Sequence, residues 1–155
     1  FKIARKQNIT TVLNPAPAIE LPKSLLELTD IIIPNETEAE LLTGISINNE
    51  SDMKETATYF LDLGISAVLI TLGEQGTYCA YQEQYKMIPA CNVKAIDTTA
   101  AGDTFIGAFL SELNKDLSNL ESAIRLANQA SSLTVQRKGA QASIPTRKEV
   151  EAEYN

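Results

Sequence analysis

The feature that most constrains the fold is a regular alternation of short apolar runs with helical patterns. Residues 31–33 are three consecutive isoleucines, and residues 67–72 form a second apolar run. Runs that are apolar throughout predict strands covered on both faces of a sheet. Between these runs, residues 35–42 and 51–63 space their apolar side chains as helices do, and a glycine soon follows each. The alternation predicts an α/β fold with a doubly wound, mainly parallel sheet and helices on both faces.

The rest of the chain supplies further predicted elements. The segments at 77–81 and 85–88 alternate in polarity, which indicates an antiparallel hairpin at a sheet edge. The other predicted elements are a buried strand at 10–13, a brief helix between Pro22 and Asp30, and helices at 99–113, 120–136 and 146–155. The side chains predicted to be buried on the longer helices are Met53, Ala57, Phe60, Leu61, Ile124, Ala127, Leu133 and Val135. No repeat or linker-like segment divides the chain, so we expect one domain.

Composition excludes several classes of function. The chain has 155 residues, 44% of them hydrophobic, but no apolar run long enough to cross a membrane. The formal net charge of -7 argues against a nucleic-acid or anionic-membrane partner, because both require a basic surface. The chain contains no histidine, which removes a Ser-His-Asp triad and most transition-metal sites. Acid–base chemistry would therefore fall to carboxylates or lysines.

The cysteines and the first residues indicate the setting of the chain. Cys79 and Cys91 match no zinc-binding or redox spacing, and no signal peptide is recognisable. We therefore expect reduced thiols in a cytoplasmic protein rather than a disulfide. The chain begins at Phe1, without a methionine and within a helical pattern, so we expect a fragment of a longer protein.

Four loops are candidates for chemistry, since ligands of doubly wound sheets bind at the carboxyl ends of strands. The first loop, residues 34–40, follows the isoleucine run. Asn35 can cap a helix while Glu38, three residues later, reaches back to complete a capping box. The same two residues can face a magnesium-bound phosphate, with Glu38 holding the metal through water. The two interpretations are compatible.

The second loop, residues 70–76, takes a strand directly into a turn with two glycines. One interpretation is an ordinary hairpin entry. The other uses Thr71 and the backbone at Gly73 and Gly76 to approach a triphosphate and ribose closely. A full dinucleotide fingerprint and a P-loop lysine motif are both missing, which excludes a Rossmann dehydrogenase and a P-loop enzyme.

The third loop, residues 97–105, reads Asp-Thr-Thr-Ala-Ala-Gly-Asp-Thr-Phe. Its small residues precede an apolar helical pattern, so bare N–H groups at the positive end of a helix can approach a phosphate. The carboxylate of Asp103 would repel that anion unless it has a role of its own. The obvious role is to remove a proton from an attacking hydroxyl. The alternative is a helix start softened by glycine.

The fourth loop, residues 137–145, is long and irregular and leaves a predicted helix. Its basic residues suit a solvated C-terminal cap at the negative helix end. In a functional alternative, several backbone carbonyls are directed at a cation, or the loop frames an adenine.

Together the four loops resemble those of the ribokinase family of carbohydrate kinases in order and approximate spacing. The matching motifs are Asn-Glu-Thr-Glu at 35–38, Thr-Leu-Gly at 71–73, the whole of 97–105 and Lys-Gly-Ala-Gln at 138–141. Residues 14–17 and 137–141 strengthen the likeness, which covers essentially the whole chain. The resemblance implies that residues 1–155 are the carboxyl-terminal, nucleotide-binding half of one domain. The parent would be about twice this length, with a lid and a sugar loop in its first half.

The resemblance also assigns roles to residues. Asp103 would be the base that takes the proton from the ribose O5 hydroxyl. The N–H groups of the anion hole would come from Ala100, Ala101, Gly102 and Asp103. The residues implied to contact ATP and Mg²⁺ are Asn35, Glu38, Thr71, Gly73, Glu74, Gly76 and, near the adenine, Asn128. The residues implied to hold a monovalent cation, K⁺ in particular, are Asp97, Thr99, Thr134, Arg137, Gly139 and Ser143.

The implied activity is phosphorylation of D-ribose at O5 by ATP in the intact parent, which would be a homodimer. This chain alone would have little or no kinase activity, because the groups that position the sugar belong to the other half. The alternatives are a parent that acts on another sugar or a nucleoside, and a noncatalytic nucleotide-binding fragment.

Overall fold

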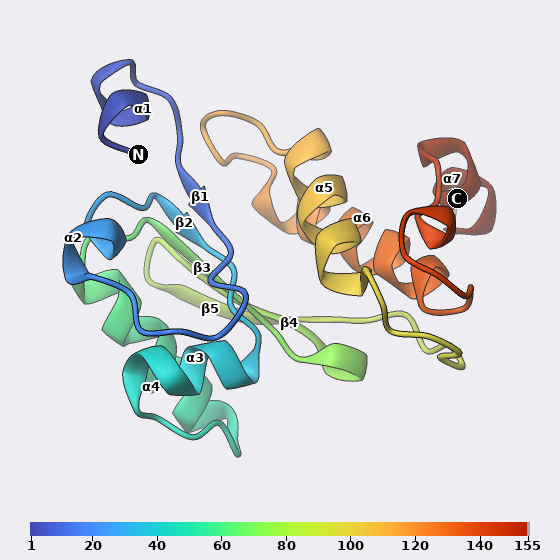
Figure 1. The fold of residues 1–155 in the computed structure, drawn as a ribbon, viewed down its shortest axis with the longest axis horizontal. Coiled ribbons are helices and arrows are strands. Elements are labelled where there is room, and N and C mark those ends of the chain that lie inside the picture. The colour runs from blue at the N-terminus through green and yellow to red at the C-terminus, as the bar shows by residue number, and fades with distance from the viewer. Residues whose placement is uncertain (155) are drawn as a thin grey trace. The chain divides into compact units, whose positions relative to one another are not determined.

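The computed structural model describes residues 1–154 and confirms the predicted α/β class (Figure 1). Five strands form one sheet in the order β1-β2-β3-β4-β5. Their bounds are β1 (Val12–Leu13), β2 (Ile31–Ile32), β3 (Ala67–Thr71), β4 (Gly76–Tyr81) and β5 (Gln84–Pro89). The chain groups into two compact units, the first formed by Phe1–Leu72 and Tyr78–Met87, the second by Gly73–Thr77 and the chain from Ile88 onward. Each unit is described by itself.

The parallel strands are the apolar runs of the sequence. β2 pairs in parallel with β3, with Ile31 opposite Ala67 and Ile32 opposite Val68, and all four side chains are fully buried. β1 pairs in parallel with β2 on its other side. The prediction that β1 is buried is wrong, since Val12 and Leu13 are half-buried. β1 ends the strand order, so only one of its edges has a neighbouring strand.

The hairpin predicted at the sheet edge is present as β4 and β5. The two residues between the strands, Gln82 and Glu83, have φ values of 48° and 62°. Two left-handed residues give a reversal whose twist matches that of paired strands. β5 is accordingly the last strand of the order.

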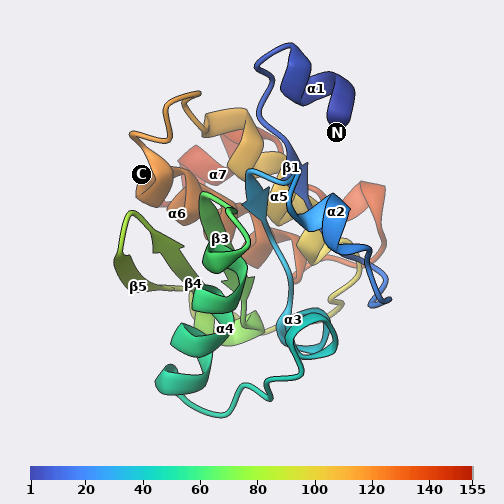
Figure 2. The ribbon, with the colours of Figure 1, turned by 90° about the vertical axis from the view of Figure 1, so that its left-hand side faces the viewer.

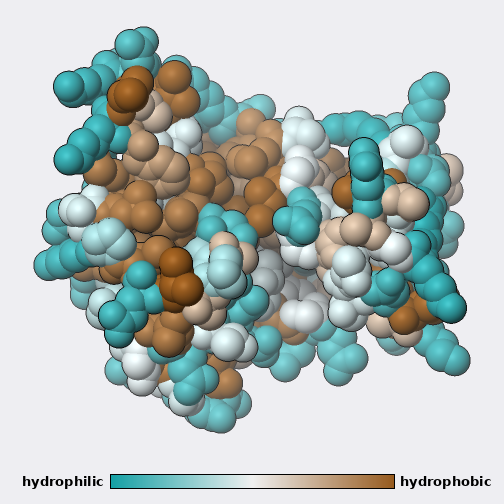
Figure 3. Space-filling model, in the orientation of Figure 1, coloured by the Kyte–Doolittle hydropathy of each residue, from teal (hydrophilic) through white to brown (hydrophobic). Residues whose placement is uncertain are grey.

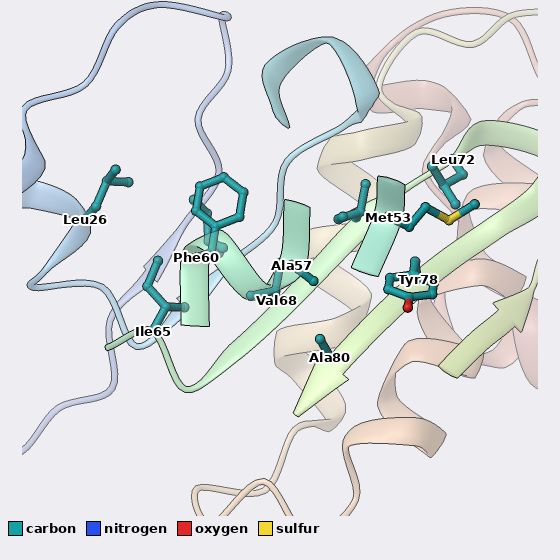
Figure 4. Packing of buried hydrophobic residues seen from close by; sticks show 11 residues of the cluster. Leu26, Met53, Ala57, Phe60, Ile65, Val68, Leu72, Tyr78 and Ala80 are labelled. Carbon is teal, nitrogen blue, oxygen red and sulfur yellow. The ribbon is translucent and has the colours of Figure 1, made fainter. Parts of the chain in front are cut away.

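The first unit contains helices, of which α3 (Glu36–Thr43) and α4 (Glu50–Asp62) pack on β3. Its other helices are α1 (Lys2–Lys6) and α2 (Lys23–Leu26). Figure 2 shows α3 and α4 beside β3, in agreement with their contacts. The predicted apolar face of α4 is buried at Met53, Ala57 and Phe60, which lie in one cluster with Val68 and Tyr78 (Figure 4). Leu61, also predicted to be buried, is half-buried at the margin of this face.

The second unit contains helices and short turns. Its elements are η1 (Gly73–Gln75), α5 (Ala101–Glu112), α6 (Leu120–Thr134), η2 (Gln141–Ser143) and α7 (Arg147–Tyr154). α5 packs on α6, and Val150 of α7 packs against Ala130 and Leu133 of α6. Ile124 and Ala127 are buried as predicted. Val135 is half-buried instead, because α6 ends at Thr134 and Val135 is its C-cap. The last predicted helical residue, Asn155, lies outside the described residues.

The surface has an uneven distribution of apolar residues. On the face shown in Figure 3, apolar atoms gather over α1 and beside β1, while hydrophilic side chains cover α7. Phe1, Ile3 and Ile9 are among the exposed apolar residues of that part of the first unit. In the described part of the chain, no helix combines the length and the apolar character that a membrane span requires. Cys79 and Cys91 are thiols, as predicted.

A buried hydroxyl in α4 provides a test of the core. The Thr56 side chain is fully buried, and within residues 1–154 its hydroxyl has no hydrogen-bond partner. Thr56→Val keeps the shape and removes this unmet polar group, so we expect the free energy of unfolding to rise by about 1 kcal/mol. Urea denaturation of the chain measures it.

The matched control is Thr58→Val on the same helix. The Thr58 hydroxyl donates to the Lys54 carbonyl at 2.8 Å and lies 3.3 Å from the Tyr85 hydroxyl. Its removal should leave stability unchanged or lower it. A destabilised Thr56→Val variant would contradict this account of the α4 core.

Candidate functional site

The first unit brings together three of the predicted nucleotide residues. The Glu38 N–H donates to Asn35 Oδ1 and the Asn35 N–H donates to Glu38 Oε2, both at 2.9 Å, so the predicted capping box is confirmed. Asn35 also forms a parallel bridge with Thr71. The carboxyl ends of β2 and β3 therefore place Asn35, Glu38 and Thr71 side by side. Glu38 is buried although it is charged, whereas Asn35 is exposed.

The turn that precedes α5 has an unusual backbone. Ala100, the N-cap, has φ 62° and ψ 9°, the left-handed conformation that residues with a Cβ seldom adopt. The Ala101 N–H donates to the Thr98 carbonyl at 3.2 Å, and the Thr104 N–H donates to the Ala100 carbonyl at 2.9 Å. No side chain caps this helix. The chain is thus reversed sharply into the first turn of α5.

Two donors remain available in that first turn. Among the described residues, no acceptor reaches the N–H groups of Gly102 or Asp103. Both residues are exposed, including the Asp103 carboxylate. Unsatisfied N–H groups at a helix N-terminus attract an anion, because the helix dipole places positive charge there. The turn therefore places an exposed carboxylate beside two backbone N–H groups that have no acceptor within residues 1–154.

The Asp97 carboxylate joins this turn to the fourth loop. Its Oδ1 accepts from the Thr99 N–H at 2.9 Å, and its Oδ2 accepts from the Gly139 N–H at 3.0 Å. The hydrogen bond from Gly139 and then those from Thr99 lower the Asp97 pKa from 3.8 to about 2. The Ile96 and Asp97 N–H groups both donate to the Val135 carbonyl. We call these contacts the Asp97 clasp.

The side chains of the other predicted cation ligands have protein partners. The buried Thr134 hydroxyl lies 3.0 Å from the Thr104 hydroxyl and 3.2 Å from the Ala130 carbonyl. The buried Ser143 hydroxyl donates to the Ala140 carbonyl at 2.6 Å. The Arg137 guanidinium donates to Glu149 at 2.8 Å. A cation at these residues would accordingly depend on backbone oxygens, since within residues 1–154 no three His, Cys, Asp or Glu side chains gather.

The remaining predicted nucleotide residues lie at η1 and in α6. Gly73 and Glu74 are exposed in η1, whereas Gly76 and Asn128 are buried. Asn128 accepts from the Thr77 hydroxyl and donates to two backbone carbonyls. Sequence reasoning missed Thr77 and also Thr104 and Ser131. The signal available for them was a hydroxyl residue within an apolar helix or strand.

Comparison with known proteins identifies the family. Residues 1–147 match the model of the pfkB family carbohydrate kinases. The chain belongs to this family. The ribokinase of Staphylococcus aureus is 64% identical over 150 residues, which cover 97% of this chain and 49% of that protein. The bifunctional ribokinase/ribose-5-phosphate isomerase A of Fructilactobacillus sanfranciscensis is 52% identical over 97% of this chain and 28% of its own length.

Solved structures agree with the predicted fold. The structure of Arabidopsis thaliana ribokinase complexed with ribose and ATP superposes with a TM-score of 0.90 at 33% identity, over 97% of this chain and 49% of that one. Ribokinase from Thermotoga maritima gives a TM-score of 0.86 at 36% identity. The chain thus spans about half the length of the ribokinases that it matches. The predicted resemblance to half of a ribokinase is confirmed.

The Asp97 clasp makes a prediction about pH. Because the folded pKa lies below 3.8, the stabilisation from the ionised carboxylate is complete above that pH and is lost as the pH falls toward 2. A ¹³C NMR titration of the Asp97 carboxyl should therefore have its midpoint near 2. A midpoint at 3.8 would contradict the clasp.

A second measurement at neutral pH uses Asp97→Asn. The neutral amide is a weaker acceptor, so the Gly139 amide should exchange its hydrogen faster. Asp116→Asn is the control, because the Asp116 carboxylate accepts from the N–H and the hydroxyl of the nearby Ser118. It should leave exchange at Gly139 unchanged.

Proposed function

We propose that this chain is the nucleotide-binding, catalytic half of an ATP-dependent sugar kinase whose intact form phosphorylates D-ribose at O5. The observation that carries the proposal is the first turn of α5, where the exposed Asp103 lies beside two N–H groups that have no acceptor within residues 1–154. The 64% identity to a protein named ribokinase supports ribose as the substrate. The neighbour complexed with ribose and ATP supports both substrates.

Asp103 would act as the base. A carboxylate can accept the proton of the O5 hydroxyl while that oxygen attacks the γ-phosphoryl group. The N–H groups of Gly102 and Asp103, with the backbone of Ala100 and Ala101, would stabilise the charge that spreads over the transferring phosphoryl oxygens. A base beside an anion-binding turn would serve both steps, removal of the hydroxyl proton and stabilisation of the charge on the transferring phosphoryl group.

The proposed metal and nucleotide contacts follow the same logic. Asn35, Glu38 and Thr71 offer oxygen atoms at the carboxyl ends of two strands, a donor set that suits Mg²⁺ with its water shell. Mg²⁺ would neutralise phosphate charge there. The residues proposed to line ATP are Gly73, Glu74 and Gly76, with Asn128 nearby. A monovalent cation, K⁺, would be held at Asp97 and at backbone oxygens of Thr99, Thr134, Arg137, Gly139 and the Ser143 position.

The parent protein is proposed to be a cytoplasmic homodimer that takes ribose and ATP.

The identities to proteins named ribokinase, 64% and 48%, exceed the 35% identity to a deoxyribokinase of Salmonella typhi, which favours ribose over deoxyribose. Kinetics with a panel of sugars and nucleosides decide this point. Another substrate with a higher kcat/KM than ribose would contradict the assignment.

The direct test uses a full-length chimera in which this chain replaces the matching half of the Staphylococcus aureus ribokinase. Asp103→Asn in the chimera should lower kcat by about 10³-fold or more, because the general base is lost, and should spare ATP affinity. Asp62→Asn, at the end of α4, is the control and should be neutral. Retained turnover in Asp103→Asn would contradict its role as the base.

The isolated chain has its own predicted behaviour. It should bind a non-hydrolysable ATP analogue with Mg²⁺ in calorimetric titration, yet form little or no ribose 5-phosphate, because the sugar is not positioned. Absence of binding at any salt concentration would indicate a noncatalytic remnant instead.

A further inference from the structure

The amide donors of Asn128 are both engaged inside the second unit. Its side chain is only 6% exposed in the middle of α6. Oδ1 accepts from the Thr77 hydroxyl at 3.0 Å, and Nδ2 donates to the carbonyls of Ile88 at 3.1 Å and Pro89 at 3.2 Å. An amide nitrogen carries two hydrogens, so both donors have acceptors in the protein. Neither hydrogen is left to donate to a nucleotide base.

Two of the segments that Asn128 joins, the start of β4 and the end of β5, also approach each other through the backbone. A Cβ built on Gly76 would lie 2.2 Å from the Ile88 carbonyl oxygen and 2.5 Å from the Ala90 nitrogen. Gly76 has φ +112°, which side chains rarely allow. The Ala90 N–H donates to the Gln75 carbonyl at 3.4 Å. The start of β4 and the end of β5 can therefore touch only because residue 76 has no side chain.

These contacts lie directly after η1. Gly73 and Glu74 of η1 are exposed, and the next residues, Gly76 and Thr77, are buried. An exposed turn of three residues keeps a fixed shape only if its ends are fixed. Beside the backbone bond of Gln75, the hydrogen bond between Thr77 and Asn128 is a side-chain anchor just after the carboxyl-terminal end of η1.

We propose that Asn128 is a positioning residue that fixes the η1 turn for ATP by holding Thr77 and the Ile88–Pro89 carbonyls against α6. We call these three side-chain contacts the Asn128 lock. The inference rests on the proposed function for its nucleotide, but the lock itself is a property of the folded chain. This proposal distinguishes two possible roles of Asn128, positioning of the η1 turn and direct contact with adenine. Asn128 lies beside the nucleotide turn, and its effect on ATP passes through Thr77 rather than through a hydrogen bond to adenine.

The first arm of the test needs no ligand. Hydrogen–deuterium exchange is measured on the 155-residue chain with Thr77→Val, Asn128→Leu and both together. Each single variant leaves buried polar groups unpaired, so amides in 73–77 and 88–90 should exchange about tenfold faster. The double variant should exchange no faster than the more affected single variant, since both remove the same hydrogen bond. Gln129→Ala, next to Asn128 on α6, is the control and should have no effect.

The second arm measures the nucleotide in the full-length chimera. Both single variants should raise KM for MgATP about tenfold, with kcat little changed and with the same preference for ATP over GTP. Thr77→Val is decisive, because it keeps the asparagine and removes only its partner.

Each outcome has one meaning. Additive or absent effects on exchange would overturn the lock. A changed ATP-over-GTP preference in Asn128→Leu, with none in Thr77→Val, would overturn the positioning role in favour of direct contact with the base. A wild-type chimera that binds no nucleotide contradicts the proposed function, whereas the exchange arm still decides the lock.

Discussion

The hydrogen bonds that the Asp97 carboxylate accepts from Gly139 and Thr99 hold the candidate site together. They join segments 42 residues apart, and they use both carboxylate oxygens. Bonds of this kind are strong because the acceptor is ionised, and they lower the pKa of Asp97 for the same reason. With Asp97 so engaged, the turn from Thr98 to Asp103 can keep a left-handed Ala100, a conformation that costs about 1 kcal/mol or more in isolation.

The packing of α5 on α6 stabilises the turn that precedes α5. The Ser131 hydroxyl donates to the Ala101 carbonyl at 2.9 Å, and the buried hydroxyls of Thr134 and Thr104 lie 3.0 Å apart. Thr104 follows Asp103 directly, so the position of Asp103 along α5 depends on the contact of Thr104 with the end of α6. The small residues of the turn leave its backbone exposed. The hydroxyl groups of Ser131, Thr104 and Thr134 hold the start of α5 in place against α6. A similar arrangement follows η1. Gly76 allows the start of β4 to approach the end of β5 closely, and Asn128 holds the two segments together through hydrogen bonds.

The extent to which the sequence predicted this structure depends on how local each interaction is. The capping box of Asn35 and Glu38 spans three residues, and the isoleucines of β2 pair with another fully apolar run, so both were predictable from the chain. Leu61 and Val135 were predicted to be buried but are half-buried. The prediction failed there because the spacing of apolar residues does not show where a helix face or a helix ends. The partners of Asn128 lie 39 to 51 residues away, and no local pattern indicates them. The family resemblance implied that Asn128 lies near the adenine, but only the tertiary structure shows that both hydrogens of its amide already have acceptors.

We propose that an anion binds the N–H groups at the start of α5 while ATP lies along η1. The chain has seven glycines, so selective ¹⁵N-glycine labelling gives one amide signal for each. On titration of the 155-residue chain with MgATP, we expect the signals of Gly73, Gly76 and Gly102 to shift together and to saturate. Those of Gly44, Gly64 and Gly107 should remain in place. Saturable binding that leaves Gly102 unshifted would contradict the claim.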